Sequence, residues 1–373
     1  MPANGRDTPR VGGGPADRRP SRRKLAGILK WLALLTLLAA PLGFLYSQVG
    51  LELDARLAPP KREMFMVDGH AVHVVCTGRG PPTFVIDSGL GGWSIYSWRI
   101  QPLLARLGRT CSFDRPGLGW SDASNEGHDG IAAADQLERI VKAAHIPTPF
   151  VYVGLSFGAN LAPIYYSRYP RDVSALVLME PDDPKQMLKH FRGTRRTAMA
   201  AADCGLLCQA AGVAGELGLT RVRAQTAGTD YFRGDALAQI RAGFSRPDWI
   251  KSLAAYFVAG PKIAYEDLDV TSFGDTPVLV LASPEMRGPE WGETAAEVKA
   301  SRPDFLRYLS SLAAASSRGV GPIVIPNSTH MTMTLGRDQA KEVVRYIREF
   351  VSRWPDTAAG AGTPPSTSPP GKR

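Results

Sequence analysis

The sequence predicts an α/β protein whose mostly parallel sheet is covered by helices on both faces. The first observation is a hairpin signal, Asp68-Gly69, between two apolar stretches at residues 64–67 and 72–76. The second is that short β-branched apolar runs then alternate with helical patterns, the order expected of parallel strands joined by helical crossovers. The third is an interruption over about 184–272, where Ala- and Gly-rich helical sequence without a clear strand predicts an inserted helical lid.

The predicted elements follow one another along residues 63–354, which we expect to form one folded domain. After the hairpin, strands are expected at residues 83–87, 109–113, 150–153, 175–180, 277–282 and 322–326. Helices are expected at residues 97–107, 130–144, 159–169, 302–317 and 338–353. A strand that is buried on both faces carries a continuous apolar run, which is the pattern of most of these strands.

The two ends of the chain do not share this pattern. Residues 1–24 lack apolar periodicity and carry seven Lys or Arg against two Asp, which is more than half of the net charge of +9. A disordered basic arm is predicted there, and a disordered tail is predicted over 355–373, which is rich in Pro, Gly, Ser and Thr. Because little positive charge remains for the folded body, nucleic acid is not an expected partner.

A long apolar segment follows the basic arm. The 21 residues 31–51 contain no charge, close to the ~20 residues that cross a bilayer as a helix. We therefore expect a transmembrane anchor over 25–51 and an extended linker over 52–62. The protein would be a single-pass protein of the cell membrane, with the arm in the cytoplasm and the folded domain outside it. A cleaved signal peptide is the alternative, but no small-x-small cleavage site follows the segment.

The four cysteines fall into two pairs. Cys76 and Cys111 lie at corresponding places in two predicted strands, whereas Cys204 and Cys208 are four residues apart on a predicted lid helix. Outside the cytoplasm both pairs could form disulfides, and buried thiols are the alternative for either pair. No histidine clusters with them, so a metal site is not expected.

A serine lies where a nucleophile would be expected. The strand over 150–153 runs into Gly154-Leu155-Ser156-Phe157-Gly158, and a helical pattern begins at Ala159. In this strand, turn and helix context G-x-S-x-G is typical of a nucleophilic serine, because the strained turn tolerates only Gly-sized neighbours and presents the hydroxyl at the sheet edge. The helix N-terminus below it favours developing negative charge. We therefore predict Ser156 as the nucleophile.

A serine hydroxyl needs a base to take its proton. Of the six histidines, only His330 follows a late predicted strand by a short polar loop and precedes the final helix. Functional groups converge in loops at this edge of a parallel sheet. His330 is therefore the predicted base.

The acid that orients the base has three candidates. Glu180 closes the strand over 175–180, Glu285 follows the strand over 277–282, and Asp182 lies two residues beyond Glu180. We favour Glu180 because it emerges directly from a strand, whereas Glu285 lies in a loop that contains Pro and Gly. Asp182 is the next candidate.

Two backbone N–H groups should bind the oxyanion. Phe157, directly after the nucleophile, supplies one of them. The other is expected from Leu90 in the loop Ser88-Gly89-Leu90-Gly91-Gly92, where glycines let the backbone approach closely. This loop lacks the glycine spacing of phosphate-binding loops, and no cofactor is expected.

Together these motifs resemble the α/β-hydrolase fold family. The matching stretches, in the family's order over residues 63–354, are Ser88 to Gly92, Asp114-Arg115-Pro116-Gly117-Leu118-Gly119-Trp120-Ser121, Gly154 to Gly158 and Asn327-Ser328-Thr329-His330. The resemblance is greatest to membrane-anchored bacterial members of the lipase or esterase type. It argues against epoxide-hydrolase and dehalogenase chemistry, since the elbow carries Ser156 where those enzymes have Asp.

Two departures from the family pattern bear on the site. Leu155 stands where many relatives have His, and Ser283-Pro284-Glu285 stands where the family usually has Gly-x-x-Asp. The second departure resembles subfamilies whose acid has moved to the strand that ends here at Glu180.

The expected function is therefore that of a serine hydrolase, which cleaves a carboxylic ester or related acyl bond of a small molecule through an acyl-enzyme on Ser156. A cofactor-free perhydrolase, an amidase and a peptidase are alternatives, because one fold supports several chemistries. A non-catalytic, membrane-tethered binding module is the remaining alternative, and it has no need of both Ser156 and His330.

Overall fold

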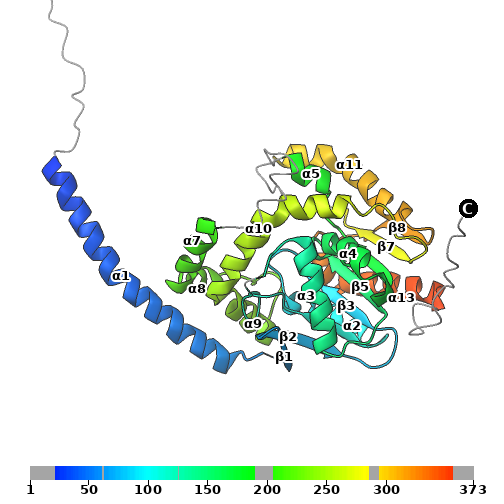
Figure 1. Ribbon diagram of the computed structural model, residues 1–373, viewed down its shortest axis with the longest axis horizontal. Coiled ribbons are helices and arrows are strands. Elements are labelled where there is room, and N and C mark those ends of the chain that lie inside the picture. Colours follow the sequence, from blue (N-terminus) through cyan, green and yellow to red (C-terminus); the bar gives the residue numbers. More distant parts are fainter. Residues whose placement is uncertain (1–21, 61–62, 125, 190–204, 285–293, 356–373) are drawn as a thin grey trace, which may run out of the picture.

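An eight-stranded sheet lies at the centre of the computed structural model, which describes residues 22–60, 63–124, 126–189, 205–284 and 294–355 (Figure 1). The order of the strands in the sheet is β1-β2-β4-β3-β5-β6-β7-β8. The strands are β1 (Glu63–Val67), β2 (His70–Thr77), β3 (Phe84–Asp87), β4 (Thr110–Phe113), β5 (Phe150–Leu155), β6 (Val173–Met179), β7 (Val278–Ala282) and β8 (Gly319–Val324).

The sheet begins with an antiparallel hairpin and continues as parallel strands. β2 pairs antiparallel with β1 and with β4, whereas all pairs from β4 to β8 are parallel. The predicted hairpin turn at Asp68-Gly69 lies between β1 and β2. Because parallel strands share a direction, the loops after β3, β5, β6 and β8 converge at one edge of the sheet.

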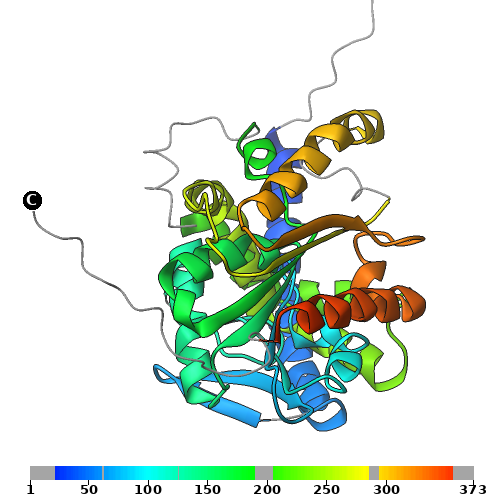
Figure 2. The same ribbon diagram turned by 90° about the vertical axis from the view of Figure 1, so that its right-hand side faces the viewer.

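Helices cover both faces of the sheet (Figures 1 and 2). On one face lie α3 (Gly130–Ala143), α4 (Phe157–Arg168) and α11 (Ala295–Ala314), and on the other lie α2 (Gln101–Leu104) and α13 (Arg337–Arg353). The short elements are η1 (Ser94–Ser97), η2 (Pro170–Asp172) and α12 (Thr332–Leu335).

Two layers of core follow from the side-chain alternation of the strands. Along β5, Phe150 and Tyr152 pack with α3 and α4, while Val151 and Val153 pack with α2 and α13. Successive side chains of a strand point to opposite faces, so a strand covered on both sides must be apolar throughout. That requirement explains the continuous apolar runs that predict these strands.

The described residues between β6 and β7 are helical, with no strand among them. They form α5 (Pro184–Lys189), α7 (Gly205–Glu216), α8 (Leu219–Ala224), α9 (Gly234–Ser245) and α10 (Pro247–Leu268). α10 packs against α4 and α3 of the core and against α5 and α7 of the insertion. This is the segment for which the sequence predicts a lid, and residues 190–204 of it lie outside the described residues.

α1 (Arg22–Leu57) extends further than the sequence predicts. Residues 52–57, expected as an extended linker, continue the helix, so that prediction is wrong there. Glu52 and Arg56 form an i,i+4 ion pair, and Asp54 forms a salt bridge of 2.6 Å with Arg221 of α8. These contacts favour helix up to the residues that precede Pro59-Pro60, where proline disfavours it.

The predictions for the two ends fare differently. Residues 22–24, expected within the disordered arm, begin α1, while residues 1–21 and 356–373 lie outside the described residues. Among the residues that the structure describes, no helix is both long enough and apolar enough to span a membrane. The predicted transmembrane anchor over 25–51 is therefore not supported.

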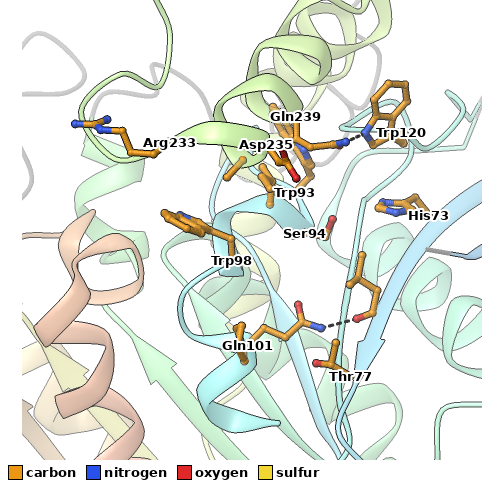
Figure 3. A pocket seen from close by; sticks show the side chains of 14 residues that line it. His73, Thr77, Trp93, Ser94, Trp98, Gln101, Trp120, Arg233, Asp235 and Gln239 are labelled. Atoms are coloured by element: carbon orange, nitrogen blue, oxygen red, sulfur yellow. Dashed lines mark hydrogen bonds between the residues drawn. The ribbon is translucent and has the colours of Figure 1, made fainter. Parts of the chain in front are cut away.

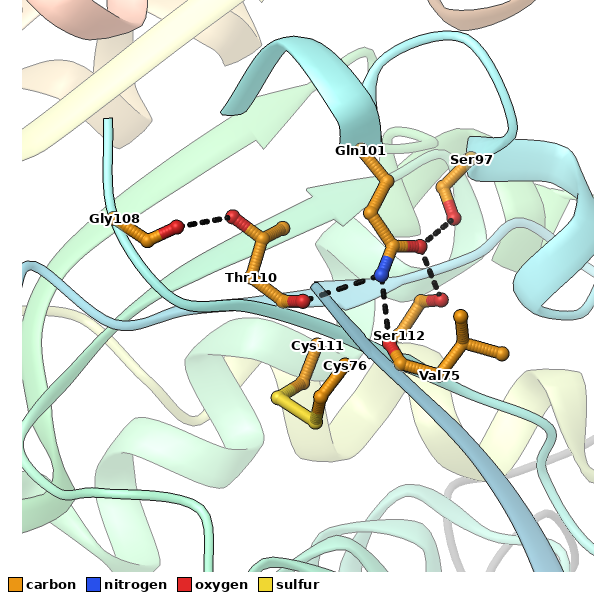
Figure 4. Close-up of a disulfide and its surroundings, with 8 residues drawn as sticks. All are labelled: Val75, Cys76, Ser97, Gln101, Gly108, Thr110, Cys111 and Ser112. Carbon is orange, nitrogen blue, oxygen red and sulfur yellow. Dashed lines mark hydrogen bonds between the residues drawn. A yellow bond between two sulfur atoms is a disulfide. The ribbon is translucent and has the colours of Figure 1, made fainter. Parts of the chain in front are cut away.

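Cys76 and Cys111 form a disulfide that joins β2 to β4 (Figure 4). The two residues are directly opposite each other in the antiparallel pair, with their Cα atoms 4.1 Å apart. Gln101 at the start of α2 ties the same strands together, since its Nε2 donates to the carbonyls of Val75 and Thr110 at 2.6 and 3.2 Å. Of the second pair, Cys208 is also disulfide-bonded, and Cys204 lies outside the described residues.

Candidate active site

Ser156 lies in the tight turn between β5 and α4. Its backbone angles are φ 53° and ψ −121°, a region that residues other than glycine rarely adopt. A Cβ on Gly154 would lie 2.6 Å from the Cα of Ala159, and a Cβ on Gly158 would lie 2.4 Å from the carbonyl oxygen of Asp87. Glycine at both places therefore permits this turn, which puts Ser156 at the carboxyl end of β5 and at the first turn of α4.

Glu180 and His330 are brought together from distant parts of the chain. Glu180 follows the last residue of β6, and His330 lies in the loop between β8 and α12. Nδ1 of His330 lies 2.8 Å from Oε2 of Glu180. The other carboxylate oxygen accepts hydrogen bonds from the backbone N–H and the hydroxyl of Ser283, each at 2.6 Å.

The environment of Glu180 favours its charged form. Its side chain is only 3% exposed, and burial by itself raises the pKa of the carboxyl group. The hydrogen bond and charge of His330 and the two hydrogen bonds from Ser283 act in the opposite direction, and the net result is a pKa below the usual value. A carboxylate at this position accepts the Nδ1 proton of His330 and leaves Nε2 as the basic nitrogen.

Ser156 and His330 line one cavity of about 320 Å³, which we call the catalytic cavity. The two residues expected to form the oxyanion hole, Leu90 and Phe157, line it as well. Tyr256 of α10 also lines it, so the cavity lies between the carboxyl edge of the sheet and the helical insertion. The structure thus brings four of the five predicted site residues to one space, and Glu180 reaches that space through its hydrogen bond to His330.

The other two candidates for the acid have different places. Asp182 lines the catalytic cavity, and its backbone is tied to Asn160 of α4 by hydrogen bonds of 2.7 and 2.9 Å. Glu285 lies outside the described residues. Glu180 is the candidate with a hydrogen bond to His330.

Arg115 holds the glycine-rich loop, a role that the sequence patterns did not predict. Its buried guanidinium pairs with Asp87 and donates to the carbonyls of Ser88 and Gly89, at 2.8 and 2.6 Å. Because the N–H and C=O of a peptide point in opposite directions, the bond to the Gly89 carbonyl turns the N–H of Leu90 away from Arg115. In the sequence, Arg115 lies two residues after the buried strand β4, within the stretch from Asp114 to Ser121 that resembles the family.

The insertion also contacts this loop. Nε1 of Trp249 in α10 donates to the carbonyl of Gly91 at 2.9 Å. Asp87, at the base of the loop, accepts a hydrogen bond from the hydroxyl of Tyr152 at 2.8 Å. Burial raises the pKa of Asp87, although Arg115 and Tyr152 favour its charged form. The loop is thus fixed by both the core and the insertion before any substrate binds.

The described residues contain no group of three or more His, Cys, Asp or Glu side chains placed to hold a metal ion. The groups that the site brings together are a hydroxyl, an imidazole held by a carboxylate, and a rigid glycine-rich loop. These are the groups of nucleophilic acyl transfer.

Comparisons with known proteins agree with this architecture. Residues 82–202 match the model of a family described as alpha/beta hydrolase fold. The uncharacterized proteins YbdG and YqjL of Bacillus subtilis (strain 168) are 25% identical over 162 residues and 28% identical over 121 residues. These stretches are 43% and 31% of this chain, and the chain spans about half the length of each relative, 50% and 47%.

Solved structures are similar over most of the chain. The epoxide hydrolase CorEH has a TM-score of 0.55 at 18% identity, covering 78% of this chain and 98% of that one. The Cfl2 protein of Burkholderia cenocepacia has a TM-score of 0.54 at 21% identity, covering 77% of this chain and 94% of that one. At these identities the likeness concerns the fold alone. It agrees with the family match and with the strand order of the sheet, and the chain has the α/β-hydrolase fold.

Proposed function

We propose that this protein is a serine hydrolase that cleaves a carboxylic ester or a related acyl bond of a small molecule through an acyl-enzyme on Ser156. The observation that carries the proposal is the hydrogen bond between His330 and the buried Glu180, at the wall of a cavity that Ser156 also lines. A nucleophile, a base and an orienting acid from three loops at one sheet edge are what acyl transfer requires.

Each group has a defined part in the proposed reaction. The hydroxyl oxygen of Ser156 attacks the substrate carbonyl while Nε2 of His330 takes its proton, and the Glu180 carboxylate stabilises the imidazolium. The backbone N–H groups of Leu90 and Phe157 donate to the oxyanion. His330 then returns the proton to the leaving group and activates the water that hydrolyses the acyl-enzyme.

An adjoining cavity supports a substrate with an extended apolar group. This cavity of about 550 Å³ shares Tyr96 and Met331 with the catalytic cavity and is lined by residues of α8, α9 and α10. Its lining includes the apolar side chains of Ala224, Phe232 and Phe244. Apolar surface removed from water contributes roughly 0.8 kcal/mol per CH₂ group, so we expect esters of longer acyl chains to be turned over better than acetates.

The alternatives differ in what they predict. A perhydrolase, an amidase or a peptidase of this fold would use the same residues and would be separated by its products. Epoxide opening, the activity for which the similar CorEH protein is named, is not supported by a serine in the position of Ser156. A non-catalytic binding module would not react covalently at Ser156.

Labelling by a fluorophosphonate tests the proposal. We expect the wild-type protein to be labelled at Ser156, and the Ser156→Ala variant to be unlabelled and to lose ~10³-fold or more in turnover of a p-nitrophenyl ester. The melting temperature should change little, because the turn is kept. Ser174→Ala, at a half-buried serine of β6 away from the site, is the matched control and should retain labelling.

Two results would contradict the proposal. Ester turnover by Ser156→Ala close to that of the wild type would exclude Ser156 as the nucleophile. An unlabelled wild-type protein that melts cooperatively would favour the binding module.

We also propose that the catalytic domain lies outside the cytoplasm. The disulfide between Cys76 and Cys111 supports this location, because disulfides form and persist in oxidising compartments and are rare in the cytosol.

A further inference from the structure

Three helices of the insertion, α7, α8 and α9, line the cavity of about 550 Å³ that adjoins the catalytic cavity and that we call the acyl cavity. Ala214 of α7, Ala224 of α8 and Phe244 of α9 are among its lining residues. The acyl cavity meets the catalytic cavity at Tyr96 and Met331, which line both. The positions of the three helices therefore help to set the width of the acyl cavity.

α1 runs along the outer side of the same three helices (Figure 1). Ser47, Gly50 and Asp54 of α1, and Ala58 just after it, are buried or half-buried, and most residues between them are exposed. These positions recur every three or four residues, which is the spacing of one helix face. A Cβ on Gly50 would lie 2.1 Å from Cζ of Arg221 in α8, so glycine leaves room for the guanidinium against this face.

Polar contacts join this face of α1 to two of the three helices. The hydroxyl of Ser47 donates to the carbonyl of Gly215 in α7 at 3.4 Å. Arg221 of α8 donates from Nη1 and Nη2 to the two carboxylate oxygens of Asp54, at 2.6 and 3.2 Å. A bidentate pair of this kind fixes the relative orientation of its two side chains.

The third helix is joined to the end of α1 through Gln239 of α9. Its Nε2 donates to the carbonyls of Ala58 and Pro59 at 2.9 and 2.6 Å. Its Oε1 accepts a hydrogen bond from Nε1 of Trp120 at 2.7 Å (Figure 3). Trp120 lies in the loop after β4, so the end of α1 and α9 are both fixed to the core of the domain.

The pair between Asp54 and Arg221 is ionic and largely buried, with side chains 21% and 10% exposed. Removal of one partner leaves the other charge largely buried without it, which is more costly than the loss of a surface pair. α8 is only six residues long, and Thr220 and Ala224, on either side of Arg221 in the chain, line the acyl cavity. Because so short a helix has little stability of its own, its position depends on the contacts that it makes.

We infer that Asp54 and Arg221 are positioning residues for the acyl cavity. α1 holds α8 through this pair, and the position of α8 sets how well a long acyl chain binds. The inference rests on the proposed function, in which the acyl cavity receives the acyl chain of the substrate. Neither residue is among the described residues that line the two cavities, so the pair acts through Thr220 and Ala224. An acetyl group is too short to depend on the pair.

Steady-state kinetics of the full-length protein with p-nitrophenyl octanoate and p-nitrophenyl acetate test the inference. We expect Asp54→Ala to raise KM for the octanoate about 10-fold, which corresponds to the loss of roughly two buried CH₂ groups of the chain. KM for the acetate and kcat for both esters should change little, because the pair lies apart from the catalytic residues. Glu52→Ala is the matched control, since Glu52 pairs with Arg56 of the same helix and both side chains are exposed. It should leave all of these constants unchanged.

A double-mutant cycle shows whether the two residues act as a pair. Asp54→Asn and Arg221→Gln replace each charge by a neutral polar side chain, and a melting curve confirms that each variant is folded. Each should raise KM for the octanoate and not for the acetate. The double variant should raise KM by less than the product of the two single factors, because both single variants remove the same interaction.

Several results would overturn the inference. An unchanged KM for the octanoate in Asp54→Ala is one, and a rise of the same size for both esters or for Glu52→Ala is another. Single factors that simply multiply in the double variant would show that the two residues act separately.

Failure of the proposed function gives a different result. If the wild-type protein hydrolyses neither ester, the hydrolase proposal fails, and calorimetric titration with sodium octanoate tests the positioning role without turnover. Asp54→Ala should then weaken octanoate binding about 10-fold relative to the wild type, by the same loss of buried chain. Equal affinity of the two proteins, or no binding by the wild type, overturns the inference.

Discussion

Glu180 combines burial with three hydrogen bonds, one from His330 and two from Ser283. It also adopts a positive φ of 47°, which is uncommon for a residue other than glycine. A strained backbone conformation of this kind persists only where the surrounding contacts hold it in place, and such residues cluster at functional sites. At this position the strain sets the direction in which the side chain leaves β6 and meets the imidazole.

The change Glu180→Gln should lower kcat for an ester by about 10²–10⁴-fold with little change in KM. The amide has nearly the same shape, but it cannot stabilise the imidazolium, and its NH₂ group can face Nδ1 and favour the wrong tautomer. Steady-state kinetics with a p-nitrophenyl ester give the two constants.

Asp182→Asn is the matched control, because it removes a neighbouring carboxylate that lines the same cavity. Glu285→Gln is also expected to do little. If Glu285→Gln were the damaging change and Glu180→Gln harmless, the loop after β7 would supply the acid.

The contact between α4 and α10 decides where the insertion lies over the site. Nδ2 of Asn160 in α4 donates to Asp267 of α10 at 2.9 Å and to the carbonyl of Asp182 at 2.7 Å. One side chain therefore ties a core helix, the insertion and the loop after β6. Burial raises the pKa of Asp267 to about 7, with a further increase from the charge of Asp183, while the hydrogen bond from Asn160 acts against it.

Asp267 should make the stability of the protein depend on pH. Its folded pKa of about 7 lies above the ordinary value of 3.8, so its contribution is fully present below pH 3.8 and is lost as pH rises through 7. Asp267→Asn removes this pH dependence and should gain stability relative to the wild type between pH 5 and pH 8, by about 3 kcal/mol at most, since only the roughly two pKa units from 5 to 7 fall in that range. Melting temperatures at the two pH values measure the effect.

Asp269→Asn, at an exposed carboxylate on the same helical end, is the control and should follow the wild-type curve. Parallel pH profiles for Asp267→Asn and the wild type would show that Asp267 is ionised in the folded protein at both values.

In the molecule as a whole, the disulfide joins β2 to β4 at the antiparallel end of the sheet. The bridge links residues 35 positions apart and lies close to Gln101, which hydrogen-bonds to both strands (Figure 4). Together they fix the hairpin edge against the parallel sheet.

Replacement of Cys76 and Cys111 together by alanine should lower the free energy of unfolding by about 3–4 kcal/mol, the loop-closure value for a ring of this length. Denaturant titration measures the loss. Under a thiol reductant the wild-type protein and the double variant should have nearly equal stability, since both then lack the bridge. Equal stability without reductant would show that the bridge does not constrain the unfolded chain.

The same bridge tests the proposed location. An alkylating reagent added to cells at lysis should leave Cys76 and Cys111 unmodified if the domain lies outside the cytoplasm, because both thiols are then oxidised. Full alkylation of both would contradict that location.

Local sequence determines the turn at Ser156 and the strands of the parallel sheet. The backbone turn at Ser156 requires glycine at positions 154 and 158, which are close to it in the chain. The parallel strands have continuous apolar sequences because both of their faces are buried. The convergence of Ser156, Glu180 and His330 at one edge could be expected from the alternation of elements, because parallel strands end on the same side.

Other features were decided only by the tertiary structure. The prediction of an extended linker failed over residues 52–57, where Asp54 pairs with Arg221 of α8. No sequence pattern links these two residues. Arg115 and Trp249, which are far apart in the sequence, both donate hydrogen bonds to carbonyls of the glycine-rich loop. The pattern of residues along the chain predicts which face of a helix or strand is buried and how neighbouring residues are arranged. A contact between distant segments forms only when the whole sheet and its helices have packed.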